Sequence, residues 1–354
     1  MARTVHRAPE TKHIVLKPLR RLSWPFWLIG AGIVLLAAAA ALYLAPSDRY
    51  IFLPDEAQPL EPRVEVEGEK PDPNGGGIYY VAVDVRKASL LEKAFPGLFE
   101  GATLEPASNV LEEGQDEQSR RRCELAAMKK SQEYATAVAL RELDYQLPTT
   151  LLGVAVEGTF PGYPAAGKLR SCDWIRAVDG TPVRRAQQVT RALSAKKPGQ
   201  LVRMRIEREG ERSTVVVRAA RDPRQRSRAF VGVSVTDVFQ VAEAPVDVEI
   251  DLGQVGGPSA GLAFALQVME ELGEGVDRGY QLAATGEIFL DGSVSRVGGI
   301  KQKTIGARRS GMDLFLVPGD NAREARRYAK GLRIVPVDSF QQALRALATL
   351  PPKA

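Results

Sequence analysis

The chain has 354 residues, a formal net charge of +5, and only two histidines and two cysteines. Both histidines, His6 and His13, precede a long apolar segment, which excludes a Ser-His-Asp triad, a Cys-His peptidase and a histidine-based zinc site downstream. Residues 1–24 carry the whole charge surplus, and the rest of the chain balances at 42 basic against 42 acidic residues. No basic field therefore remains for nucleic acid, and we expect neither a metal nor a nucleic-acid partner.

The first predicted element is a membrane helix over residues 25–45, "PFWLIGAGIVLLAAAAALYLA", which contains no charge. Its 21 residues would span roughly 30 Å, the thickness of the hydrocarbon core of a bilayer. The alternative is a cleaved signal peptide, whose apolar region is usually only about 7–15 residues long. We expect a single-pass anchor in the cell membrane, with the basic tail of residues 1–24 in the cytoplasm and all later domains outside it.

Residues 46–76 are rich in Pro, Glu and Gly and predict a flexible tether. Residues 77–148 then contain a strand, "GIYYVAVDV", and a helix, "CELAAMKKSQEYATAVALREL". Cys123 opens that helix, and Cys172 lies in a turn of the next unit. An oxidising compartment would permit a disulfide between them, but two cysteines do not establish one, so the pairing stays open.

Residues 149–221 contain "PGYPAAGKLRSCDWIRAVDGTPV" and resemble a PDZ domain. In that family a Pro-Ala-x-x-x-Leu helix start precedes a Gly-Asp-x-Ile-x-x-Val-Asp-Gly hairpin, and Cys172 stands where glycine is usual. The resemblance implies that a peptide adds as a strand beside "LLGVAV", with Leu152, Gly153 and Val154 as contacts. The alternative is a vestigial groove that only packs.

A candidate nucleophile lies in "QVGGPSAGLAFAL", residues 254–266, where Gly257 to Gly261 match G-x-S-x-G around Ser259. By itself this match is weak, because a glycine-rich turn that opens a buried helix has the same composition. Without an available histidine, any base for Ser259 must be a lysine or a carboxylate. The later stretch "ATGEIFLDGSVSRVGGIKQKTIGARRSGMDLFLVP" offers two lysines, Lys301 and Lys303.

The two stretches together resemble the proteolytic domain of Lon-type serine peptidases. That family carries a Gly-Pro-Ser-Ala-Gly nucleophile motif and, past a Thr-Gly-Glu-Ile strand, a Gly-Gly-x-Lys-x-Lys segment with the base. With the apolar helix and the PDZ-like unit, the chain is similar to bacterial membrane-anchored PDZ/Lon-like proteins. The resemblance implies one α/β (α+β) proteolytic domain, built from residues 77–148 and 229–350, into which the PDZ domain is inserted.

Helix geometry favours Lys303 over Lys301 as the base. Two residues along a helix are about 200° apart, so only one of the two lysines can face Ser259. Lys303 shares its face with Ile300, Thr304 and Ala307, which indicates burial, and the family pattern also places the base at the second lysine. Burial would lower the pKa of the ammonium so that the amine can accept a proton.

The resemblance further implies that Thr285 orients this amine, and we expect N–H groups near Gly257, Ser259 and Ala260 to stabilise the oxyanion. It also implies a homo-oligomeric ring, such as a hexamer. No G-x-x-x-x-G-K-[ST] loop occurs in the sequence, so we expect no ATP and no other cofactor. The predicted function is an ATP-independent serine endopeptidase that cleaves exported or membrane-associated proteins, with the PDZ domain engaging substrate. The alternative is a proteolytically inactive, membrane-tethered PDZ scaffold that binds peptides.

Overall fold

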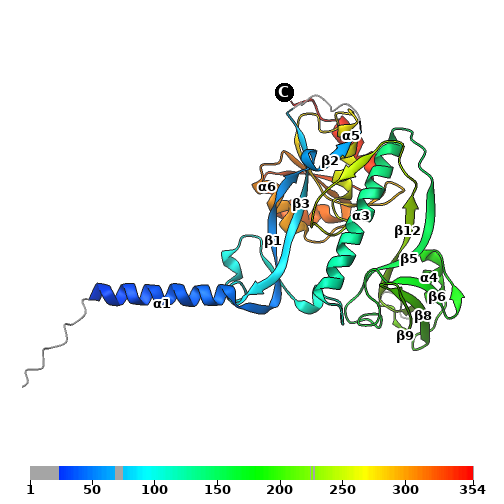
Figure 1. Ribbon diagram of the computed structural model, residues 1–354, viewed down its shortest axis with the longest axis horizontal. Helices are drawn as coiled ribbons and strands as arrows, with labels where there is room; N and C mark the ends of the chain where they lie inside the picture. The colour runs from blue at the N-terminus through cyan, green and yellow to red at the C-terminus, as the bar shows by residue number, and fades with distance from the viewer. Residues whose placement is uncertain (1–23, 68–74, 224, 226–227, 354) are drawn as a thin grey trace, which may run out of the picture.

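The computed structural model describes residues 24–67, 75–223, 225 and 228–353. Its first element is helix α1, Trp24–Leu44, which extends away from the body of the molecule as a single rod (Figure 1). By length and composition the 18 residues Trp27–Leu44 can cross a membrane, and none of them is buried, although a signal sequence passes the same test. The predicted basic tail lies, apart from Trp24, outside the described residues.

The body is a mixed α/β structure, as predicted, and its first sheet has six strands in the order β18-β17-β14-β3-β1-β4. Strands β3, β14, β17 and β18 run parallel, whereas β1 is antiparallel to both of its neighbours. The bounds are Pro46–Pro59 for β1, Gly77–Ser89 for β3, Thr103–Pro106 for β4, Gln281–Ala284 for β14, Leu314–Pro318 for β17 and Arg333–Val337 for β18.

Helices cover both faces of this sheet, and the sequence of β17 shows why. All five residues of β17 are buried, as expected for a parallel strand with helices on both sides. Leu314 and Leu316 pack in one core with α3, α5 and α8, while Phe315 and Val317 pack in a second core with α6 and α7. The helix bounds are Glu117–Glu142 for α3, Gly261–Glu271 for α5, Ile300–Arg309 for α6, Gly319–Tyr328 for α7 and Phe340–Ala348 for α8.

The predicted flexible tether over residues 46–76 is wrong for its first part. Residues 46–59 form β1, which lies between β3 and β4 and buries Tyr50 and Ile51. Its prolines lie where the regular ladder is interrupted or ends: Pro46 and Pro54 each precede a register shift, and Pro59 is the last residue of the strand. As a result, α1 continues into the first sheet through Ala45 alone, and residues 68–74 lie outside the described residues.

A second sheet has the order β12-β5-β6-β8-β9, and β7 pairs with β6. It surrounds its own core, which includes Val154, Ile175 and Val189, the last of these on helix α4. The bounds are Thr149–Thr159 for β5, Trp174–Val178 for β6, Thr181–Pro182 for β7, Ala186–Ser194 for α4, Leu201–Arg208 for β8, Glu211–Arg218 for β9 and Val233–Val241 for β12.

The first sheet takes strands from both sides of residues 149–221: β1, β3 and β4 precede them, and β14, β17 and β18 follow. The two antiparallel strands β5 and β12 form a long ribbon that connects the two parts of the body (Figure 1). Strand β12 belongs to the second sheet, yet its Phe239 and Val241 pack against the first core. The second part of the proteolytic domain was predicted to begin at residue 229, but β12 contributes to both units.

The remaining elements are short. They are α2 (Leu90–Ala94), the 3₁₀ turns Glu61–Arg63, Pro96–Leu98 and Ala107–Asn109, and three two-stranded pairs: β2 (Val64–Val66) with β13 (Val248–Ile250), β10 (Ala220–Arg221) with β11 (Ala229–Phe230), and β15 (Glu287–Ile288) with β16 (Val294–Ser295).

Candidate active site

Ser259 lies in the tight turn that precedes helix α5, and the two glycines of its motif have separate physical roles. Gly257 has φ +88°, a backbone conformation that favours glycine. A Cβ at Gly261 would come within 2.7 Å of Ser131 Oγ and 2.8 Å of Ile288 Cγ2, so the turn approaches its neighbours too closely for any side chain there. The G-x-S-x-G spacing is thus required by conformation at one glycine and by packing at the other.

Helix α3 holds this turn from the side. The N–H of Gly257 donates to the carbonyl oxygen of Glu124 (2.8 Å), and the hydroxyl of Ser131 donates to the carbonyl oxygen of Pro258 (3.0 Å). Glu124 and Ser131 were not predicted as site residues. The only sequence signal was a polar residue, Ser131, on the buried stripe of a helix, and a buried hydroxyl needs a hydrogen-bond partner.

Lys303 reaches Ser259 from helix α6. That helix begins after Gly299, whose φ is +65° and whose missing Cβ makes room for Val83. The Nζ of Lys303 lies 2.6 Å from Ser259 Oγ, and the lysine is only 4% exposed. Lys301 points elsewhere, since its Nζ donates to the carbonyl oxygen of Ala102 at 3.0 Å. The structure therefore brings the predicted pair together and separates the other lysine from it.

Thr285 is the third side chain of the site, beside Ser259 and Lys303. It is fully buried at the end of β14, and its Oγ1 lies 3.0 Å from the Nζ of Lys303. The Thr285 hydroxyl donates its proton to the carbonyl oxygen of Ser259 (2.9 Å), so its oxygen can only accept from the amine. A neutral amine that donates to Thr285 can direct its single lone pair toward Ser259 Oγ.

Burial lowers the pKa of Lys303 from the ordinary 10.5 to about 7, with desolvation as the cause. At that pKa a substantial fraction of the amine is neutral near pH 7 and can accept the hydroxyl proton of Ser259.

The predicted oxyanion donors are only partly available. The N–H of Gly257 is bound to Glu124, so the prediction for this residue is wrong: the turn uses that donor to attach itself to α3. Among the described residues, the N–H groups of Ser259 and Ala260 have no protein acceptor. Both lie at the N-terminus of α5, where the helix dipole favours negative charge.

A cleft of about 700 Å³ opens in front of Ser259 and Lys303. Its walls include residues 52–55 of β1, residues 80–85 of β3 and residues 254–256 before the nucleophile turn. β14 pairs with β3 only from Gly77 to Tyr80, so beyond that point this edge of β3 has no strand partner in the described chain. An unpaired strand edge therefore lines the wall of the cleft.

Residues 226–349 match the family described as the Lon protease (S16) C-terminal proteolytic domain, and residues 133–218 match the PDZ domain family. The chain carries a Lon-type proteolytic domain and a PDZ domain. The predicted Lon-type proteolytic domain, PDZ domain and mixed α/β fold class are thus confirmed.

Two relatives are similar to about a third of this chain. The chain is 34% identical over 120 residues to a Lon protease of Chloroflexus aggregans, and 36% identical over 124 residues to a Lon protease of Xanthomonas oryzae pv. oryzae. These matches cover 32% and 34% of this chain, and the chain spans only 14% of the length of either relative. A solved PDZ domain of an SdrC-like protein from Listeria monocytogenes is 22% identical, with a TM-score of 0.23, over 24% of this chain and 90% of that one.

The PDZ domain does not offer the predicted peptide contacts. Strand β5, which carries Leu152, Gly153 and Val154, pairs with β12 along its length on one edge and with β6 on the other. At Gly153, where β5 does not pair with β6, the side chains of Trp174 and Arg176 lie against the backbone. The prediction that a peptide adds beside these residues is therefore wrong, because β12 already occupies that place. The outer strands of this sheet are β12 and β9.

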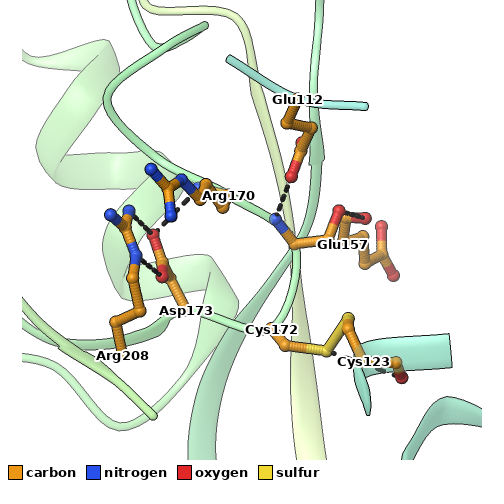
Figure 2. The surroundings of a disulfide bond; sticks show 8 residues. Glu112, Cys123, Glu157, Arg170, Cys172, Asp173 and Arg208 are labelled. Atoms are coloured by element: carbon orange, nitrogen blue, oxygen red, sulfur yellow. Dashed lines mark hydrogen bonds and ion pairs between the residues drawn. A yellow bond between two sulfur atoms is a disulfide. The ribbon is translucent and has the colours of Figure 1, made fainter. Parts of the chain in front are cut away.

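A disulfide joins Cys123 of α3 to Cys172 of the PDZ domain, which the sequence left open (Figure 2). Cys172 has φ +68°, the conformation that the usual glycine of this turn would adopt. The turn is fixed by its neighbour Asp173, whose carboxylate accepts two hydrogen bonds of 2.7 Å from Arg208 (Figure 2). Because Cys123 directly precedes Glu124, the bridge attaches the PDZ domain next to the residue that holds the nucleophile turn.

Proposed function

We propose that this protein is a membrane-anchored, ATP-independent serine endopeptidase in which Ser259 is the nucleophile and Lys303 the general base. The observation that carries the proposal is the 2.6 Å separation between Nζ and Oγ at a lysine whose pKa burial lowers to about 7. Desolvation is the means by which a lysine becomes a base near neutral pH. Thr285 acts as a positioning residue, since it binds the amine and the backbone of the nucleophile at once.

The reaction follows from these positions. Ser259 Oγ attacks the carbonyl carbon of the scissile bond while its proton passes to Lys303 Nζ, and the N–H groups of Ser259 and Ala260 receive the negative oxygen. Lys303 then returns the proton to the departing amine, which leaves an acyl-enzyme on Ser259. Water attacks this ester with Lys303 again as the base, and the serine is regenerated.

The substrate class is an extended polypeptide. The edge of β3 at residues 81–85 has backbone groups available on the wall of the cleft, so a substrate segment can add to it as a strand. Main-chain pairing of this kind does not need a free substrate terminus, which favours an endopeptidase. The sequence contains no phosphate-binding loop of the Walker type, so the chain by itself would cleave segments that are already unfolded or exposed.

We assign the proteolytic and PDZ domains to the extracytoplasmic side of the cell membrane, with α1 as a single-pass anchor and the N-terminus in the cytoplasm. The Cys123–Cys172 disulfide supports this side, because disulfides persist in oxidising compartments. The natural substrates would then be exported or membrane-associated proteins.

The PDZ domain would engage these substrates at β12 instead of β5. β12 is an outer strand of its sheet, and α4 lies against it: the N–H of Ala186 donates to Asp237 of β12 at 2.5 Å. A peptide strand could add to the outer edge of β12 beside α4. The ring-shaped homo-oligomer implied by the Lon-type domain belongs to the same proposal, and its test is the mass of the detergent-solubilised protein.

A fluorophosphonate probe tests the peptidase against the inactive scaffold. The full chain in detergent or vesicles should be labelled at Ser259, and both Ser259→Ala and Lys303→Met should abolish labelling and hydrolysis of an unfolded protein substrate. Lys301→Met is the matched control, because it removes a lysine of the same helix that does not face Ser259. Absence of labelling in every assembly state of the native chain would favour the scaffold.

A further inference from the structure

The body exposes an unusual apolar segment next to the end of α1. Eight large hydrophobic side chains outside α1 are exposed in the described residues, and three of them, Leu90, Phe95 and Leu98, fall within nine residues of one another. Leu98 is 73% exposed, a value equal to that of Leu36 in α1 and lower only than that of Leu44 there. The run from Ala94 to Phe99, "AFPGLF", contains no charge.

The start of this segment is held by the junction between α1 and β1. Ser89 pairs with Pro46, the first residue of β1, and the N–H of Leu90 donates to the carbonyl oxygen of Ala45 at 2.9 Å. In Figure 1 the cyan segment that follows β3 lies beside the end of α1, on the side of the body from which α1 departs. Any membrane that α1 spans would therefore pass close to this segment.

The base of the segment is rigid, so its exposed tip is not a loose loop. Glu92 is fully buried and accepts hydrogen bonds from Arg86 at 2.6 and 3.0 Å. Ser89 and Glu92 form a capping box at the start of α2. The charged residues on both sides of the tip are paired: Lys93 with Asp48 of β1, and Glu100 with Arg308 and Arg309 of α6.

We propose that residues 94–99 insert into the interface of the same membrane that α1 spans, as a second and shallow contact with lipid. The occupant of the apolar tip is the boundary between headgroups and acyl chains, because the tip directly follows α2, which packs against α1, and carries no charge. This inference rests on the proposed anchor: without α1 in a bilayer there is no surface for the tip.

Two contacts with the membrane, through α1 and through residues 94–99, would fix the distance between the active site and the bilayer. After the tip, the chain enters residues 101–103, where Gly101 accepts a hydrogen bond from Gln302 and Ala102 accepts one from Lys301, both at 3.0 Å. Both donors lie on α6, the helix that carries Lys303. A membrane contact at residues 94–99 therefore restrains the catalytic helix relative to the bilayer and favours substrates whose exposed segments lie near the lipid.

The test places an environment-sensitive fluorophore on single cysteines of the full chain, with the Cys123–Cys172 bridge left oxidised. Leu98→Cys reports the tip, Tyr43→Cys reports the end of α1, and Val216→Cys on β9 is the exposed control. The protein is reconstituted in vesicles of phosphatidylcholine and phosphatidylglycerol that carry nitroxide lipids at shallow or deep positions. We expect several-fold stronger quenching at residue 98 than at residue 216, and stronger quenching by shallow nitroxides, since interfacial segments bury only about 5–10 Å.

The outcomes separate the two proposals. Quenching at residue 43 with none at residue 98 overturns the lipid contact and leaves the anchor intact. No quenching at either position refutes the anchor, and the lipid contact with it. Protection of residue 98 from aqueous quencher without lipid quenching would assign the tip to a protein partner and also contradict the inference.

A second set of variants checks the chemistry of the tip. With the fluorophore on Phe95→Cys, addition of Leu98→Glu should reduce lipid quenching several-fold, whereas Leu201→Glu, at an exposed leucine of β8, should not change it. Unchanged circular dichroism and unchanged labelling of Ser259 confirm that each variant is folded. Equal quenching in the Leu98→Glu and Leu201→Glu proteins would contradict insertion of the tip.

Discussion

Replacing Lys303 by methionine should stabilise the folded protein while it abolishes peptide hydrolysis. Burial lowers the pKa of this amine from 10.5 to about 7, so folding disfavours its charged form. One pKa unit corresponds to about 1.4 kcal/mol, and the shift therefore costs the native state up to about 4–5 kcal/mol at neutral pH. Methionine fills a similar volume without a charge, although it gives up the contacts of the amine with Ser259 and Thr285, which offsets part of the gain.

The sign of the pH dependence makes this prediction specific. Between about pH 7 and 10.5 the unfolded chain binds more protons at residue 303 than the folded chain does, so the stability of the native protein rises with pH in this range. The increase is about 1.4 kcal/mol per pH unit once pH exceeds the folded pKa, or roughly 2 kcal/mol between pH 7 and pH 9. The Lys303→Met protein lacks this increase, so its advantage over the native protein in free energy of unfolding should shrink by that amount.

Urea unfolding of both proteins in detergent, followed by far-ultraviolet circular dichroism at pH 7, 8 and 9, measures the difference. Groups that titrate in both proteins cancel when the two free energies of unfolding are subtracted. Lys301→Met is the control: it breaks hydrogen bonds to Ala102 and Thr103 and should lower stability by an amount that does not follow this pH dependence. A difference between native and Lys303→Met proteins that stays constant from pH 7 to pH 9 would refute the burial argument.

Three further outcomes are expected. Turnover should rise with pH and be half-maximal near pH 7, as Lys303 deprotonates. Lys303→Arg should be inactive because arginine stays charged, whereas Lys301→Ala should keep most activity; a folded, active Lys303→Arg protein would exclude the dyad. Loss of the disulfide in a Cys123→Ser, Cys172→Ser protein should cost up to about 4 kcal/mol from a cross-link across 49 residues, and dithiothreitol should lower the urea midpoint of the native protein only; equal midpoints without reductant would contradict this. Gly261→Ala should lose about 1–3 kcal/mol and most fluorophosphonate labelling, since a Cβ there would approach other side chains to 2.7 Å; normal labelling would show that the turn adapts.

Much of the proposed catalytic group was predictable because it depends on local patterns. The lone serine between small residues, the absence of histidine after residue 13 and the apolar face shared by Lys303 and Ile300 all follow from the printed chain. The choice between Lys301 and Lys303 needed only the 100° step of a helix, and the structure places the two side chains on different partners.

The two wrong predictions about strands, the tether at residues 46–59 and the free edge of β5, arose where local sequence composition conflicted with long-range pairing. Prolines and acidic residues at 46–59 resemble a tether, yet this segment forms β1, which is stabilised by pairing with β3 and β4. Those partners lie further along the chain, so no local pattern in residues 46–59 predicts the pairing. Likewise "LLGVAV" looks like a free strand, but β12, some eighty positions later, occupies its edge with the register Val154 opposite Asp237. Edge or interior status is a property of the assembled sheet and not of the strand itself.

By itself the sequence determined the chemistry that this protein can carry: a serine without histidine, a lysine on an apolar helix face, and an apolar helix long enough to span a bilayer. These properties depend on residue type and on spacings of a few positions, which the chain fixes before it folds. Only the tertiary structure decided that Gly257 gives its N–H to α3 instead of an oxyanion and that Cys123 meets Cys172. Each of these contacts joins residues 49 or more positions apart, and such contacts exist only after the sheets and helices have packed.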